Sequence, residues 1–242
     1  MIAAAFWGAI AASALLVGAL TCVVFKPGPR IIAVVMAIGS GLLFGAVAYD
    51  LVEEAQASAP LWLIGAMLLL GGVLFMLGSK LIDRSGGSRR KNPSGVDDGS
   101  APKAIAFGSV LDGIPESFAL GLSVLTGAVS IPLLAGVVLS NFPEGMASTS
   151  GLLRSGWSMR RINSMWFAVM FASAISAAAG YVLLANDSGV IAASVQAFAG
   201  GALLAMVADT MLPESYDMEK ALTGVLVVIG FAISIAIGSF TP

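Results

Sequence analysis

Acidic and amide side chains stand beside proline in two apolar segments, in the sequences DGIPE and SNFPEG. In the first, Asp112 and Glu116 are four residues apart; in the second, Ser140 and Glu144 have the same spacing, and Asn141 lies beside them. Residues four apart lie on one face of a helix. Carboxylate, amide and hydroxyl oxygens from two such faces can bind one divalent cation. These five residues are therefore our candidate metal ligands.

The stretch that holds both motifs contains no Lys or Arg, so a salt bridge within it cannot explain the acids. An ionisable side chain inside a membrane is costly unless it is paired or hydrated, and it is a functional candidate by default. If the two segments form an antiparallel hairpin, Pro115 and Pro143 lie at the same depth. Each proline also leaves one carbonyl, that of Leu111 or Leu139, without its helical partner and available as a further ligand. The alternative is a set of protonated, hydrogen-bonded structural glutamates.

The composition predicts an integral membrane protein. Of 242 residues, 58% are hydrophobic and 11% are charged, whereas about a quarter of the residues of a soluble domain are charged. The chain has no histidine and one cysteine, Cys22, which excludes imidazole chemistry and an intramolecular disulfide. The net charge of −2 gives no reason to expect nucleic acid as a partner.

Apolar segments of bilayer length account for most of the chain. Six are free of charge and close to the roughly 20 residues that cross a bilayer; they are 1–25, 31–49, 55–79, 162–186, 188–208 and 221–242. The stretch 104–153 is long enough for two more, with a break at 126–132. We therefore predict an all-α integral membrane protein, a bundle of about eight transmembrane helices.

The domain organisation follows from one polar interruption. Residues 83–102 are rich in Gly, Ser and Pro and carry both charges, which is typical of a flexible loop. We predict helices 1–3 in residues 1–82 and helices 4–8 in residues 103–242, in one membrane domain. If both termini lie outside, all twelve basic residues lie in cytoplasmic loops, as the positive-inside rule requires. We therefore expect a multi-pass protein of the cell (plasma or inner) membrane.

A faint internal repeat relates residues 41–54 to residues 201–214. These segments belong to predicted spans two and seven, which run in opposite directions. An inverted-topology repeat of a secondary transporter leaves such a match. We therefore expect a 3+2+3 arrangement of the helices.

The two proline motifs resemble those of the ZIP (Zrt/Irt-like) family of divalent metal ion transporters, whose fourth and fifth helices carry His-Asn-x-Pro-Glu-Gly and related variants. The resemblance extends over the whole chain and implies a binuclear site bridged by Glu116 and Glu144. Asp112 and Ser140 stand where the family often has histidine. Since Ser173 and Ser176 are the only substitutes for the family's helix-six glutamate, a one-metal variant stays open.

Other acids stand near predicted helix ends. Asp50 and Glu53 form a candidate entrance for cations, and Asp209 and Glu214 a candidate exit. For Asp209 an exit role and a solvated helix end are equally open. For the remaining acids at helix ends, Glu219 among them, we expect simple solvation.

We therefore expect this chain to transport divalent metal cations (Zn, Mn or Fe) toward the cytoplasm, and not to be an enzyme. An all-oxygen ligand set favours harder ions such as Mn²⁺, Mg²⁺ or Fe²⁺ over Zn²⁺. No permanently bound cofactor is expected; the partners are the metal ions and the lipid bilayer, with a homodimer left open. One alternative is a secondary transporter of another small solute. Another is an intramembrane aspartyl protease built on Asp50, although the Gly-x-Gly-Asp partner motif is missing.

Overall fold

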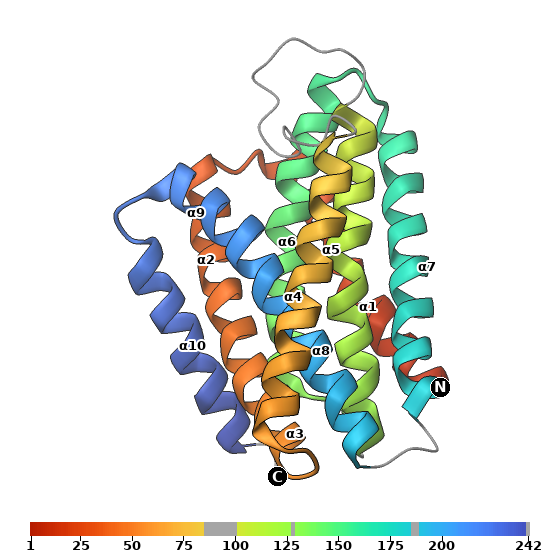
Figure 1. Ribbon diagram of the computed structural model, residues 1–242. Helices are drawn as coiled ribbons and strands as arrows, with labels where there is room; N and C mark the ends of the chain where they lie inside the picture. The colour runs from red at the N-terminus through yellow and green to blue at the C-terminus, as the bar shows by residue number, and fades with distance from the viewer. Residues whose placement is uncertain (85–100, 127–128, 185–188, 241–242) are drawn as a thin grey trace.

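The computed structural model describes residues 1–84, 101–126, 129–184 and 189–240, and within them it is all-helical, with no strand. Eight long helices form one bundle (Figure 1). They are α1 (Ile2–Phe25), α2 (Pro29–Ala46), α4 (Leu61–Arg84), α5 (Ala101–Ser123), α6 (Ile131–Arg154), α7 (Met159–Leu184), α8 (Val190–Met206) and α10 (Thr223–Phe240). The predicted loop at 83–102 lies, apart from its first and last two residues, outside the described residues.

Five of the helical segments are long and apolar enough to cross a membrane, which fits the predicted multi-pass membrane protein. They contain α1, α2, α4, α7 and α8. α5 and α6 are not among them, because Asp112, Glu116 and Glu144 lower their mean hydropathy. The helices that carry the candidate ligands are thus the least suited to contact lipid.

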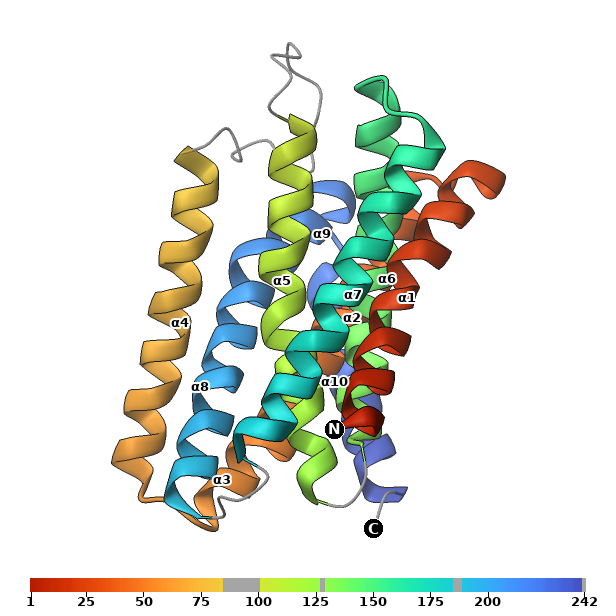
Figure 2. The same cartoon turned by 90° about the vertical axis from the view of Figure 1, so that its right-hand side faces the viewer.

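Packing places α5 and α6 in the interior of the bundle (Figures 1 and 2). α1 packs on α6 and α7, α2 packs on α6 and α10, and α4 packs on α8. α5 contacts α7, α8, α1 and α4. The two motif helices are therefore surrounded by protein.

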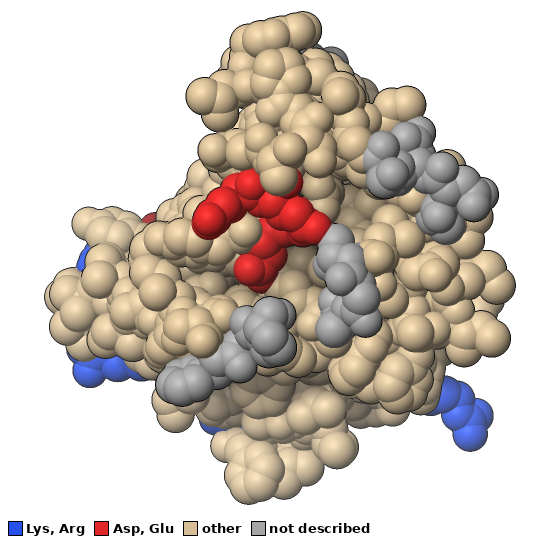
Figure 3. All heavy atoms as spheres, turned by 90° about the horizontal axis from the view of Figure 1, so that it is seen from below, with Lys and Arg blue, Asp and Glu red and all other residues tan. Residues whose placement is uncertain are grey.

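The charged residues are divided between the two ends of the bundle. The described Lys and Arg residues occur where α1, α4, α6 and α9 end and where α2, α5 and α7 begin, and these points meet at one end. The opposite face is seen in Figure 3, where acidic atoms gather near the centre and basic atoms show only at the margin. The bundle is thus polarised: the basic end holds the described Lys and Arg residues together with acids such as Asp217 and Glu219, whereas the acidic end holds none of the described Lys and Arg.

Two helices continue past their predicted ends through π-helical turns. α2 passes into the π-helix η1 (Val47–Glu53) and then α3 (Glu54–Gln56). α8 passes into η4 (Val207–Met211) and then α9 (Leu212–Glu219). The predicted ends at residues 49 and 208 are therefore too early, because a π-turn keeps the backbone hydrogen-bonded while acidic side chains project from it. The third span, predicted from residue 55, begins only at Leu61 in α4.

Backbone contact through glycine holds α2 against α10. A Cβ atom on Gly41 would lie less than 3.0 Å from the carbonyl oxygen of Val227. In return, a Cβ atom on Gly230 would lie less than 3.0 Å from the carbonyl oxygen of Ile38. Only glycine permits so close an approach of two helix backbones.

The same arrangement holds α8 against α4. Here Gly201 lies against the carbonyl of Leu68, and Gly71 against that of Phe198. Gly41 and Gly201 are 160 residues apart, as are the Ile38 and Phe198 of the two contacts. The π-helices begin at the same offset, at Val47 and Val207.

A second matched pair of crossings involves the motif helices. α6 crosses α1, and α5 crosses α7, each through one glycine from either helix. The glycine–carbonyl contacts are Gly18 with Phe142, Gly145 with Leu15, Gly180 with Phe118, and Gly121 with Ala177. The glycines of α5 and α6, Gly121 and Gly145, are 24 residues apart, and so are the facing residues Phe118 and Phe142. The two crossings therefore use the same pattern of glycine–carbonyl contacts.

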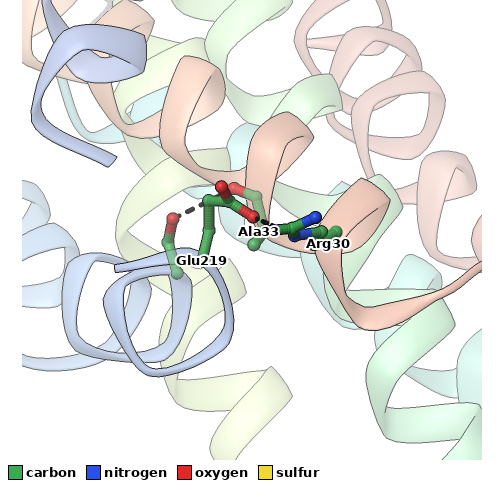
Figure 4. Close-up of polar contacts among 4 residues, drawn as sticks. Arg30, Ala33 and Glu219 are labelled. Atoms are coloured by element: carbon green, nitrogen blue, oxygen red, sulfur yellow. Dashed lines mark hydrogen bonds and ion pairs between the residues drawn. The ribbon is translucent and has the colours of Figure 1, made fainter. Parts of the chain in front are cut away.

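One acid expected to be solvated is buried instead. The Glu219 side chain, at the end of α9, is 7% exposed and pairs with Arg30 of α2 over 3.0 Å (Figure 4). Beside the pair, the Ser215 hydroxyl donates to the Ala33 carbonyl oxygen. The prediction was wrong because α9 folds back onto the start of α2, which covers the carboxylate.

Replacing Arg30 with Gln should lower the stability more than replacing Glu219 with Gln. The first change leaves a buried carboxylate without its partner, whereas the second leaves an exposed guanidinium in water. Because Arg30 is 83% exposed, we expect a loss of roughly 1 kcal/mol at most for Arg30→Gln. Thermal unfolding in detergent measures it, with Lys26→Gln as the control at an exposed basic residue. Equal losses for both partners would contradict this asymmetry.

Candidate metal centre between α5 and α6

The acids of α5 face the interior of the bundle. Asp112 and Glu116 lie one helical turn apart and are 4% and 2% exposed. The Glu116 carboxylate accepts a hydrogen bond from the hydroxyl of Ser140 on α6, with 2.7 Å between Oγ and Oε1. The hydroxyl of Ser140 also lies 2.9 Å from the Val137 carbonyl oxygen, one turn back in α6. Two of the predicted ligands thus meet across the α5–α6 interface.

Glu144 of α6 likewise accepts a hydrogen bond from a serine hydroxyl, in this case one on α5. Its Oε1 accepts a hydrogen bond of 2.6 Å from the hydroxyl of Ser109, and both residues are buried. Ser109 precedes Glu116 along α5, whereas Glu144 follows Ser140 along α6, so the two helices pair antiparallel. The two serine–glutamate contacts are separated by seven residues of α5, roughly 10 Å, and by four residues of α6, roughly 6 Å. Asp112 lies between the two levels.

Asn141 lies on a neighbouring face of α6. Its Nδ2 donates to the carbonyl oxygen of Ala11 in α1 over 3.2 Å, and the side chain is buried. Gly145, one turn further on, lies against the Leu15 backbone of α1. This side chain therefore ties α6 to α1, while Ser140 and Glu144 face α5.

The carbonyl released by Pro143 is also turned away from the carboxylates. A Cβ atom on Gly39 of α2 would lie 2.8 Å from the carbonyl oxygen of Leu139. α2 therefore packs against this oxygen, which lies at the α6–α2 contact and not among the α5–α6 contacts given above. The reason is the helical period: the residue before Ser140 projects from a different side of α6.

α7 contributes two serines near Pro115. The Ser176 hydroxyl donates to the Ile114 carbonyl oxygen over 2.9 Å, so it supports the proline-containing turn of α5. Ser173 is buried, and its hydroxyl lies 3.4 Å from where a Cβ atom on Gly113 would be. Both predicted substitutes in the sixth span thus lie against the α5 motif, Ser176 through a hydrogen bond to its backbone and Ser173 beside Gly113.

Ser109 is the functional candidate that the motifs did not identify. It lies three residues before Asp112, on the same helical face, and this spacing was the only signal in the sequence. Serine is common in apolar helices, where its hydroxyl often bonds within its own helix. Only the tertiary contact with Glu144 shows that this serine faces a carboxylate.

The candidate entrance lies at the acidic end of the bundle. Asp50 of η1 is half-buried and accepts a hydrogen bond from the hydroxyl of Ser130, which also caps α6. Glu53 is exposed on the same π-helix. Ser130 precedes Ser140 by ten residues of α6, which corresponds to about 15 Å. The acidic face in Figure 3 is therefore separate from the carboxylates between α5 and α6.

The candidate exit lies toward the opposite end. Asp209 is exposed in η4, and Glu214 is half-buried in the first turn of α9. Neither residue ends its helix, because α9 continues to Glu219. Asp209 is thus an exposed acid within a continuous helical segment, not a helix terminus as predicted.

The ligand atoms are not assembled into one cluster. In the described part of the chain, no three side chains of the His, Cys, Asp and Glu type lie close enough to hold a metal ion together. Among the described buried residues, none is Lys or Arg, so the interior carboxylates have only polar, uncharged hydrogen-bond donors in the contacts given above. No protein-family model matches this chain, and no curated protein matches it.

Proposed function

We propose that this chain transports divalent metal cations along the interface between α5 and α6. The observation that carries the proposal is the pairing of Glu116 with Ser140 and of Glu144 with Ser109, deep in an apolar bundle. Burying a carboxylate in an apolar interior is costly, so the retention of these two favours a role in binding positive charge. The likeness of both proline motifs to those of ZIP transporters supports the same reading.

The serine hydroxyls have two uses in such a site. Each donates its proton to a glutamate and so holds the carboxylate in place while no cation is bound. The same hydroxyl oxygen keeps lone pairs that can bind a cation, since a hydroxyl both donates and accepts. A cation bound between the Glu116–Ser140 contact and the Glu144–Ser109 contact would draw the carboxylates of Glu116, Asp112 and Glu144 together, in place of their hydrogen bonds to serine. Binding would thus shorten the distance between the carboxylates of Glu116 and Glu144.

The polarity of the bundle supports transport toward the cytoplasm. The basic end faces the cytoplasm, both termini lie outside, and all eight long helices span the cell membrane. The acidic face with Asp50 and Glu53 collects cations outside, and Asp209 and Glu214 line the route out on the cytoplasmic side. Movement toward the cytoplasm follows from this order.

The matched glycine crossings support an inverted repeat in a 3+2+3 arrangement. α2 against α10 and α8 against α4 use the same glycine contacts at a constant offset. The crossings of α6 with α1 and of α5 with α7 form the second matched pair. Secondary transporters place their substrate site where such repeats meet. In this bundle the meeting point is the α5–α6 pair.

Proteoliposomes that contain the protein should take up Mn²⁺ and Fe²⁺ at least as well as Zn²⁺. The proposed site offers carboxylate and hydroxyl oxygens and no imidazole, and such a set prefers harder ions. Uptake of each ion at equal free concentration measures the preference, with protein-free liposomes as the control. Strict zinc selectivity would contradict the oxygen-based site, and uptake of none of the three ions would point to another solute.

A further inference from the structure

One buried hydroxyl in α6 lacks the hydrogen bond that its neighbours have. Ser148 is 1% exposed, and its Oγ makes no hydrogen bond within the described part of the chain. Other buried serines of the bundle are bonded: Ser40 donates to the Met36 carbonyl, and Ser215 to that of Ala33. A buried polar atom without a partner is rare and needs an explanation.

Ser148 lies on α6 close in sequence to Glu144 of the carboxylate centre, the name given to Asp112, Glu116 and Glu144. It follows Glu144 by one helical turn, so the two side chains are neighbours on the surface of α6. The next residue, Thr149, faces another helix: its Oγ1 accepts a hydrogen bond of 3.0 Å from Trp166 of α7. The unpaired hydroxyl therefore lies beside Glu144, on its side nearer the basic end.

Ser109 brings a second hydroxyl to this level from α5. It is buried, and its only hydrogen bond given for the described residues is the one to Glu144 Oε1. Together, Ser109, Glu144 and Ser148 offer two hydroxyl oxygens and a carboxylate. Hard divalent cations take such oxygen ligands and complete their coordination with water.

We infer that Ser148, with Glu144 and Ser109, forms an inner cation position, one step from the carboxylate centre toward the basic end of the bundle. This inference rests on the proposed function, because it adds a step to the same route. A cation held near Asp112 and Glu116 passes to Glu144 and then to the two hydroxyls. Neutral hydroxyls bind the ion more weakly than carboxylates, which favours its release.

An engineered thiol tests the position without depending on transport. Cys22 is the only cysteine of the chain, so a Cys22→Ser background carries no thiol, and Ser148→Cys adds a single one. Titration with Cd²⁺ should then give the ultraviolet cadmium–thiolate absorption. Thr149→Cys is the matched control, since its side chain is equally buried but faces Trp166. Absence of the absorption in Ser148→Cys, or equal absorption in both variants, would overturn the inference.

Two further variants keep the test decisive. If Ser148→Cys does not give a monodisperse protein, Ser109→Cys probes the same position from α5 with the same readout and the same overturning result. Ser148→Ala removes only the hydroxyl, and Mn²⁺ uptake should fall by about ten-fold while Mn²⁺ still binds at the carboxylate centre. Unchanged uptake by Ser148→Ala would mean that the serine serves only packing, and it would refute the inner position.

The two proposals fail in different ways. If the unsubstituted protein neither binds nor takes up Mn²⁺, Fe²⁺ or Zn²⁺, the proposed function is wrong. If it does both, but neither engineered thiol on the Glu144 level binds Cd²⁺ more strongly than the Thr149→Cys control, the proposed function stands and the inner position is wrong.

Discussion

Glu116→Gln and Glu144→Gln, made singly, should each reduce Mn²⁺ uptake by about ten-fold or more, since even groups that only support a metal ligand typically contribute that much. The amide keeps an oxygen that can accept the hydrogen bond from Ser140 or Ser109, so the packing of α5 on α6 is retained. What is lost is the negative charge that would bind the cation. Binding by calorimetry and uptake into proteoliposomes should therefore fall together, at unchanged thermal stability.

Asp112→Asn extends this test to the acid between the two levels, and it has a matched control. Asp217→Asn makes the same change on α9, where the side chain is exposed. We expect Asp112→Asn to weaken Mn²⁺ binding and Asp217→Asn to leave it unchanged. Unchanged binding and uptake in all three interior variants would refute a metal route between α5 and α6.

Gly41→Ala and Gly201→Ala should each destabilise the bundle by roughly 1–3 kcal/mol, the usual cost of forcing an extra carbon into a packed core. At both positions the new methyl group would overlap a carbonyl oxygen of the facing helix, that of Val227 or Leu68. A backbone atom cannot move aside as a side chain can, so the two helices must separate. Thermal unfolding in detergent measures the loss, and the similarity of the two contacts predicts losses of similar size.

Gly65→Ala in α4 is the control for these two variants. A Cβ atom there would have nothing within 4 Å, so the change brings only the better helix propensity of alanine, worth up to about 1 kcal/mol. We therefore expect Gly65→Ala to be neutral or stabilising. If Gly41→Ala and Gly201→Ala behaved like Gly65→Ala, the close backbone crossings would be wrong.

Hydropathy was sufficient to predict the class of the fold. Long apolar segments separated by short charged ones predict an all-α membrane protein, and five helical segments have the length and composition to cross a membrane. The boundaries were less accurate where acids occur within a helix. η1 and η4 continue through Asp50 and Asp209, because backbone hydrogen bonding does not depend on whether a side chain is charged.

The burial of the polar residues in α5 and α6 was predictable from their spacing, but their contacts were not. Spacing placed Asp112 with Glu116 and Ser140 with Glu144, and these pairs do face the interior between α5 and α6. Spacing did not show that Ser109 bonds to Glu144, or that α2 packs against the Leu139 carbonyl. Those facts depend on which helix lies opposite each face, and residues far apart in the chain decide that.

By itself the sequence determined which segments prefer lipid to water and which polar groups share a helical face, since both properties depend on composition and on the helical period alone. The tertiary structure decided the partner of each polar group: Glu116 meets Ser140, Glu219 meets Arg30, and Ser148 meets no partner among the described residues. The physical reason is that hydrogen bonds and burial depend on positions within a few ångströms. Glycine contacts between helices distant in sequence set those positions.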